Sequence, residues 1–184
     1  MRKIKVDSCI GISKLNNHLE IKDKILSLID CSNDSPSNNS DGSFISKYDF
    51  PQSGNFDRQW VKELKPYLLP LLSDVIRNFG YQGMNIYQIW YQQYLKGSSH
   101  CWHIHEGQFT GVYYLEHPEG SPATEIKSPY NLETFKVDTV SEGDVIVFPA
   151  FWIHQAPINE KSRKTIISFN LNIRAPDPSY YDFK

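Results

Sequence analysis

The sequence FTGVYYLE at residues 109–116 predicts a β-strand, because β-branched and aromatic residues dominate it and turn-forming residues flank it. Other segments after residue 85 share this composition and are separated by Gly, Pro, Ser and Asn clusters, namely Ile86–Tyr94, Glu133–Val140, Asp144–Phe148 and Thr165–Ile173. No helical run interrupts them, so βαβ units are not expected. The pattern favours an antiparallel sandwich or jelly roll that is mainly β, with helices packed on one side.

Two helices are expected before these strands. Apolar residues recur at helical spacing in Glu20–Asp30, which predicts a short amphipathic helix. A second helix should begin at an Asp57 cap and run to about Phe79, with Gly80 suited to its C-terminal end. Two prolines inside it, Pro66 and Pro70, are expected to kink or split it.

The chain of 184 residues is long enough for one domain with a buried core. We expect residues 1–184 to form that domain, with 1–84 as a helical and loop support region and 85–174 as the β core. Between the two helices, the stretch 31–43 is almost entirely Ser, Asn, Asp, Gly and Pro, which is typical of a loop.

Charge and cysteine content exclude several classes of protein. The net charge of −2 indicates no strong electrostatic attraction to nucleic acid or to a membrane surface. Three cysteines without a CxxC pair predict neither a disulfide framework nor a zinc finger. No long apolar stretch follows Met1–Lys5, so we expect no secretory signal and no membrane span, and an intracellular, reducing setting.

Three histidines are the candidate metal ligands. His103 and His105 are separated by one residue, so on a strand both imidazoles point to the same face. Residues 143–149 read as a turn into a buried strand, and His154 follows within a few residues. If these imidazoles converge, they can hold a divalent iron ion and leave positions open. Glu106 is an alternative second ligand, although on a regular strand it points to the other face.

The last expected strand opens with two cations, Arg163 and Lys164. A cation beside a three-histidine site can hold an anionic ligand near the metal. Trp102 and Trp152 each adjoin a candidate ligand and are expected to wall the pocket. The other histidines are expected to be structural, with His100 in a loop and both His18 and His117 at the surface, while Cys101 is expected to be a small buried side chain.

The stretch Ile89–Asn170 resembles the iron(II)- and 2-oxoglutarate-dependent oxygenase superfamily, in its prolyl-hydroxylase-like branch common in phage and marine bacterial genomes. The matching segments are WYQQY (90–94), WHIH (102–105), FTGVYYL (109–115), GDVIVFP (143–149), His154 and SFN (168–170). The resemblance implies a double-stranded β-helix over residues 85–174. It also implies an enzyme that binds Fe(II), uses 2-oxoglutarate and O2, and hydroxylates a substrate that the sequence does not identify.

The resemblance assigns roles to single residues. His103, His105 and His154 occupy the metal-ligand positions, but His105 stands where the family usually has a carboxylate. An Arg or Lys about ten residues past the final histidine binds the distal carboxylate of 2-oxoglutarate, which is matched by Lys164 or Arg163. Tyr114 and Tyr94 resemble tyrosines that contact this cosubstrate. Tyr114 is equally compatible with a role as a core aromatic, and Tyr94 matches the family less well.

Two other functions remain open from the sequence. A cupin-type dioxygenase, isomerase or binding protein fits the spacing of Gly97 to His103 and of Gly143 to Pro149 and His154, but the usual glutamate after the histidine pair is missing. A non-catalytic scaffold that kept the fold is the third hypothesis. For the oxygenase, we expect a protein or peptide side chain or a small metabolite as substrate, and the cytoplasm, including that of a phage host, as location.

Overall fold

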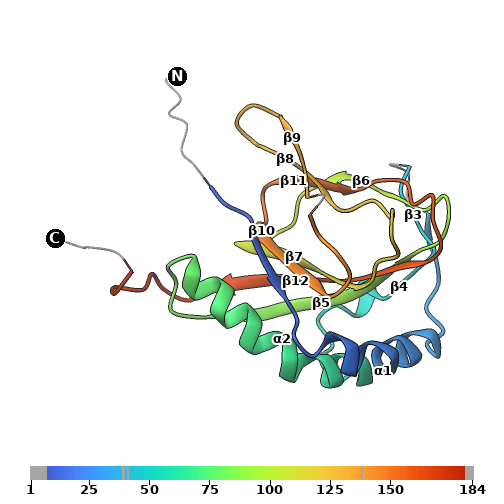
Figure 1. The fold of residues 1–184 in the computed structure, drawn as a ribbon, viewed down its shortest axis with the longest axis horizontal. Coiled ribbons are helices and arrows are strands. Elements are labelled where there is room, and N and C mark those ends of the chain that lie inside the picture. Colours follow the sequence, from blue (N-terminus) through green and yellow to red (C-terminus); the bar gives the residue numbers. More distant parts are fainter. Residues whose placement is uncertain (1–7, 39, 41, 138, 181–184) are drawn as a thin grey trace.

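The computed structural model describes residues 8–38, 40, 42–137 and 139–180. Within these residues the main layer is a six-stranded antiparallel sheet in the order β1-β10-β7-β12-β5-β4 (Figure 1). Its strands are Gly11–Lys14 (β1), Lys47–Tyr48 (β4), Met84–Tyr94 (β5), Phe109–Glu116 (β7), Asp144–Pro149 (β10) and Lys164–Ile173 (β12). The long central strands are those that the sequence predicted from β-branched and aromatic residues.

A second sheet packs on one face of the first. Its order is β6-β11-β8-β9, formed by His100–His103 (β6), Glu125–Lys127 (β8), Thr134–Lys136 (β9) and Ile153–Ala156 (β11). A small hairpin of Ser37–Asn38 (β2) and Phe44–Ile45 (β3) lies within the expected 31–43 loop and just after it. The strand expected at 133–140 is shorter, since only β9 forms there and residue 138 lies outside the described residues. The prediction of a mainly β jelly roll with N-terminal helices is confirmed.

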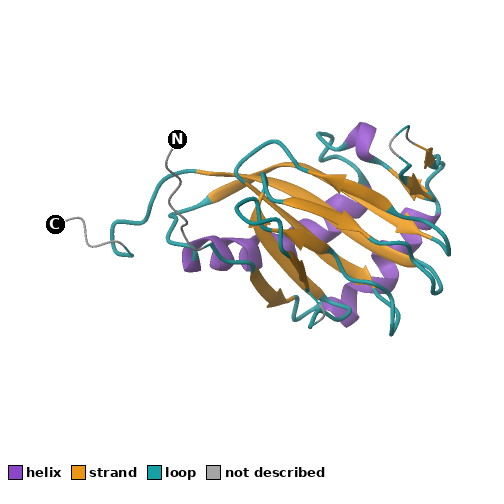
Figure 2. Ribbon diagram, turned by 90° about the horizontal axis from the view of Figure 1, so that it is seen from above, coloured by secondary structure: helices purple, strands orange, loops and turns teal. Residues whose placement is uncertain are grey.

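The helices α1 (His18–Asp30) and α2 (Gln59–Asn78) cover the other face of the six-stranded sheet (Figure 2). Strand alternation divides the core into two layers. On β7, Tyr113 and Leu115 pack against the helices, whereas Val112 and Tyr114 point between the two sheets. The same alternation on β12 decides which of its side chains enter the space between the sheets.

Two expectations for α2, a split at its prolines and an Asp57 cap, were wrong. The helix is continuous through Pro66 and Pro70, both of which lie on its exposed face, so the carbonyls that lose their N–H partners face water. Its N-cap is Arg58 and not Asp57. At the other end Gly80 ends the helix as predicted, with a φ of 86° and an N–H that donates to Arg77 O at 2.8 Å.

No helix in the described part of the chain is both long and apolar enough to cross a membrane. The first seven residues, which belong to the expected support region, lie outside the described residues. A short 3₁₀ helix, Phe50–Gln52, follows β4 and carries one wall of the cleft described below.

Candidate metal centre

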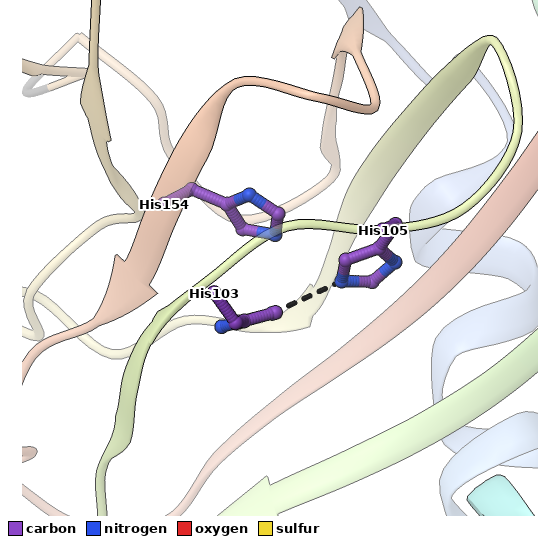
Figure 3. A group of neighbouring side chains, drawn as sticks. All are labelled: His103, His105 and His154. Atoms are coloured by element: carbon purple, nitrogen blue, oxygen red, sulfur yellow. Dashed lines mark hydrogen bonds between the residues drawn. The ribbon is translucent and has the colours of Figure 1, made fainter. Parts of the chain in front are cut away.

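The three candidate histidines converge between the two sheets (Figure 3). His103 ends β6 and pairs in register with His154 of β11, so their side chains are neighbours across the four-stranded sheet. His105 lies just beyond β6, and its backbone N–H donates to Ala150 O at 2.9 Å. One nitrogen from each imidazole lies within 4.8 Å of the other two. The sequence prediction that these imidazoles meet is therefore confirmed as geometry.

Hydrogen bonds fix the same tautomer in all three rings. His103 Nδ1 donates to Cys101 O at 2.7 Å, and His154 Nδ1 donates to Trp152 O at 2.9 Å. His105 Nδ1 donates to Asn170 Oδ1 at 2.8 Å. A carbonyl oxygen can only accept, so each Nδ1 carries a proton, and in the neutral ring the lone pair is then on Nε2.

The lone pairs of His103 and His105 face each other. Their Nε2 atoms are 3.0 Å apart, shown as the dashed line in Figure 3. When both rings are neutral with their protons on Nδ1, neither Nε2 has a proton to share, so a shared proton or a metal ion between them removes their repulsion. A metal ion held by three imidazoles meets this need, and this donor set suits iron or zinc.

The surroundings keep two of these imidazoles, those of His105 and His154, neutral. Burial and the nearby His103 lower the pKa of His105 to about 4, against the opposing hydrogen bond to Asn170. Burial also lowers the pKa of His154 well below its usual value, with further contributions from His103 and His105. Neutral imidazoles are the form that binds metal, so no proton has to leave these two rings at neutral pH.

Glu106, the alternative second ligand, does not join this group. Its side chain is exposed, and its backbone carbonyl accepts a hydrogen bond from the Tyr87 hydroxyl at 2.6 Å. The cluster of converging ligand atoms contains His105 instead.

Two cavities meet at the histidines. An outer cleft of about 550 Å³ is open to solvent and is lined by Ile45, Tyr48, Phe50, Gln88, Trp90, Gln92, His100, His103, Ile104, His105, Glu106 and Asn170. Behind it lies an inner pocket of about 20 Å³, whose walls include His154, Tyr94 and Ser168. His103 and His105 line both cavities, so a metal at the triad would lie at the junction between them.

Lys164 lies over the ring of Tyr94, which lines the inner pocket, and is almost fully buried, with 1% of its surface exposed. Its Nζ donates to Pro122 O at 2.9 Å and lies 5.0 Å from the centre of the Tyr94 ring. Burial lowers its pKa from 10.5 to about 8, and no acidic group of the described residues offsets that loss. A buried cation without a counter-ion favours binding of an anion.

The two candidate tyrosines differ in their partners. Tyr94 Oη is buried and has no hydrogen-bond partner among the described residues. The Tyr114 hydroxyl donates to Thr124 Oγ1 at 2.9 Å and accepts the Thr124 N–H at 3.1 Å. An unpartnered buried hydroxyl costs free energy, so Tyr94 is poised to bond a ligand that enters the pocket.

Arg163 points to the opposite side of β12 from Lys164. Its guanidinium forms ion pairs with Asp30 at the end of α1 and with Glu116 at the end of β7, each at 2.8 Å. The structure therefore brings Lys164 to the space between the sheets and leaves Arg163 on the helix-covered face.

Comparisons with known proteins show which solved structures share the fold of this chain. No family model matches the chain, and no curated protein matches its sequence. A Burkholderia pseudomallei oxidoreductase of the 2OG-Fe(II) oxygenase family superposes with a TM-score of 0.70 over 91% of this chain and 87% of that one, at 12% identity. The chain has the fold of the 2OG-Fe(II) oxygenases.

Two prolyl hydroxylases with this oxygenase fold are also similar. One, from Trichoplax adhaerens, was solved with a hypoxia inducible factor peptide and gives a TM-score of 0.63 at 16% identity, covering 93% of this chain and 84% of that one. The other is the viral collagen prolyl hydroxylase of Paramecium Bursaria Chlorella virus-1 in its 2OG complex, with a TM-score of 0.58 at 12% identity and coverage of 88% and 94%.

The structure corrects three expectations about the other histidines. His18 is not at the surface but 4% exposed, and its Nδ1 lies 2.7 Å from the Tyr113 hydroxyl. His100 is in β6 and not in a loop, and its ring stacks on His103 with centres 3.9 Å apart. His117 is half-buried, with its ring edge against Tyr114.

Several residues around His105 were not singled out from the sequence. Asn170 Oδ1 accepts a hydrogen bond from the Nδ1–H of His105, and the Trp90 ring stacks on the His105 imidazole with ring centres 5.4 Å apart. Thr110 Oγ1 lies 3.4 Å from the same Nδ1. The alternation of β12 could have pointed to Asn170, since it shares the parity of Lys164.

Proposed function

We propose that this protein is an iron(II)- and 2-oxoglutarate-dependent oxygenase. The observation that carries the proposal is the convergence of three imidazoles between an open cleft and an inner pocket, close to a buried lysine that has no counter-ion among the described residues. His103, His105 and His154 would hold the iron. Lys164 and the Tyr94 hydroxyl, with Tyr114 beside them, would bind the distal carboxylate of 2-oxoglutarate.

Donor chemistry fits both groups. The imidazoles carry their lone pairs toward one point, as a metal requires, and Tyr94 Oη and Lys164 Nζ lack the partners that a carboxylate would supply. The inner pocket, at about 20 Å³, has room for about one water. Binding of a five-carbon diacid therefore requires the walls around Tyr94 and Lys164 to move apart.

When bound, iron and 2-oxoglutarate would activate O2, the oxidant, so that one oxygen atom enters a substrate C–H bond and the other enters the succinate formed as 2-oxoglutarate loses CO2. The chain's own contribution is orientation and shielding. Three rings with fixed tautomers hold the metal at the cleft floor, and the core between the sheets keeps water from the inner pocket. The lysine and tyrosine hold the far end of the cosubstrate so that its other end faces the histidines.

The outer cleft is the proposed substrate site. Its walls combine apolar and aromatic side chains, among them Tyr48, Phe50 and Trp90, with polar ones such as Gln88, Gln92 and Asn170. Glu106 is the one charged residue among the described residues that line it. A neutral or positively charged protein side chain or small metabolite suits this lining, whereas a nucleic acid backbone does not.

The proposed location is the cytoplasm, including that of a phage host. Cys9, Cys31 and Cys101 are all free thiols, which suits a reducing compartment, as does a centre that must keep iron in its ferrous state.

Anaerobic addition of Fe(II), with and without 2-oxoglutarate, tests the proposal. We expect a weak visible charge-transfer band only when both are present, and its loss in His103→Ala and His154→Ala. Metal binding without a spectral response to 2-oxoglutarate would instead favour a cupin-type centre. If neither substitution changes metal binding, both the oxygenase and the cupin-type centre are refuted.

A further inference from the structure

A chain of side-chain hydrogen bonds leads from His105 to the cleft wall. His105 Nδ1 donates to Asn170 Oδ1, and Asn170 Nδ2 donates to Gln88 Oε1, each at 2.8 Å. Gln88 Nε2 in turn donates to Ser53 Oγ at 3.4 Å. Asn170 and Gln88 are register partners on β12 and β5, so the sheet itself holds their amides side by side.

The direction of this chain decides how the Asn170 amide is turned. Gln88 presents its oxygen, which can only accept, so Asn170 must turn its NH₂ group toward Gln88. The Asn170 oxygen is then left for His105 and can only accept from it. A proton on His105 Nδ1, and a lone pair on Nε2, follow from the orientation of two amides.

Thr110 supports the same protonation state. Its hydroxyl donates a hydrogen bond to Phe169 O at 3.1 Å. Its oxygen can therefore only accept from His105 Nδ1, which lies 3.4 Å away. Asn170 is 3% exposed and Thr110 is 1% exposed, so water does not compete freely for this nitrogen.

The other two imidazoles do not depend on side chains in this way. His103 and His154 donate to the backbone carbonyls of Cys101 and Trp152. His105, which stands where the resembled family has a carboxylate, is the ring whose tautomer is set by replaceable side chains.

We propose that Asn170 and Gln88 are positioning residues that make His105 a metal ligand by fixing its tautomer. The inference rests on the proposed metal centre. Loss of the Gln88 acceptor frees the Asn170 amide to rotate and offer NH₂ to His105. Nδ1 would then become the acceptor, and the proton on Nε2 would block the metal.

Co(II) binding, followed by calorimetry and by the visible d–d spectrum, tests this without any turnover. We expect Gln88→Leu to weaken Co(II) binding about tenfold and Asn170→Leu by about 10- to 100-fold, the usual range for losing an outer hydrogen-bond partner of a metal ligand. Gln88→Glu and Asn170→Asp keep the acceptors and should bind Co(II) within about threefold of the wild type. Asn85→Leu, an exposed change on the same strand, is the matched control.

The deciding comparison is the double variant Gln88→Leu/Asn170→Asp. A carboxylate at position 170 has only acceptor oxygens, so the tautomer no longer depends on Gln88 and the Gln88→Leu effect should disappear. An equal loss in both backgrounds would mean that Gln88 acts through packing alone and would overturn the inference. Wild-type protein that binds no Co(II), or binds it equally well after His154→Ala, would refute the proposed metal centre and the inference with it. If the wild type binds Co(II) and neither Gln88→Leu nor Asn170→Leu changes the affinity, the inference is refuted while the proposed metal centre stands.

Discussion

Replacement of Lys164 by Met should stabilise the protein and weaken its binding of 2-oxoglutarate. Burial lowers the Lys164 pKa from 10.5 to about 8. Each unit of pKa corresponds to about 1.4 kcal/mol, so keeping this charge in the folded state costs about 3 kcal/mol at pH 7. Met forfeits the hydrogen bond to Pro122 O and the contact over Tyr94, which together contribute about 2 kcal/mol. The net expectation is a gain of about 1 kcal/mol in the free energy of unfolding of the metal-free protein.

The dependence on pH separates this explanation from a packing effect. The folded-state pKa is below that of the unfolded chain, so between about pH 8 and 10.5 the unfolded state binds more protons and wild-type stability rises with pH. The advantage of Lys164→Met should therefore be constant below pH 8 and shrink as the pH rises through this window. Urea denaturation at several pH values measures the difference.

Anaerobic calorimetry with Fe(II) and 2-oxoglutarate supplies the second measurement for Lys164→Met. Loss of a charged hydrogen bond of about 1.5–3 kcal/mol should weaken 2-oxoglutarate binding by about 10- to 100-fold. A variant that is destabilised equally at every pH would show that Lys164 is not an uncompensated buried charge. Unchanged 2-oxoglutarate affinity would place the anion site elsewhere.

Other substitutions test the neighbouring assignments. Tyr94→Phe removes a buried hydroxyl that has no partner among the described residues. We therefore expect the free energy of unfolding of the metal-free protein, measured by thermal unfolding, to stay the same or rise by up to about 1 kcal/mol, while calorimetry shows weaker 2-oxoglutarate binding. Arg163→Ala should cost about 1 kcal/mol in urea denaturation through its half-exposed ion pairs and leave 2-oxoglutarate affinity unchanged; a large loss of affinity would contradict its placement on the helix side. Gly111→Ala would put a methyl group 2.5 Å from Ile146 O and the Phe169 ring, so we expect at least about 3 kcal/mol of destabilisation in the same assay, and an unaffected variant would disprove the close packing of β7 between its neighbours.

Local patterns were sufficient to predict the parts of the site that lie on single strands. The spacing of His103 and His105 predicted that both rings would meet, as they do although the strand ends at His103, and the parity of β12 places Lys164 with Ile166 between the sheets. Period-two alternation is a property of any strand, so these conclusions needed no knowledge of pairing. Arg163 and Lys164 were left unresolved only because the residue at which the strand begins was unknown.

Contacts between distant segments could not be predicted in this way. Asn170 meets Gln88 because β12 pairs with β5 in a particular register, and nothing local in either strand encodes that register. His18 looked like a surface residue because its partners, Tyr113 and Glu142, lie far along the chain. The prolines of α2 misled for a related reason, since which helix face meets solvent depends on the packing of the whole sheet.

His105 and Lys164 together give the site a charge pattern that suits a dicarboxylate once the walls of the inner pocket have moved apart. Three imidazole ligands bring no negative charge, so a divalent metal at the triad would keep both of its positive charges until an anion binds. At the other end of the same space, Lys164 carries a buried positive charge whose one hydrogen-bond acceptor among the described residues is the neutral Pro122 carbonyl. A ligand with a carboxylate at each end would meet a cation at each end, whereas a monoacid would leave one of the two uncompensated. The neutral residue at position 105 would thus strengthen the electrostatic attraction of the site for a dianionic cosubstrate. It does not argue against the oxygenase.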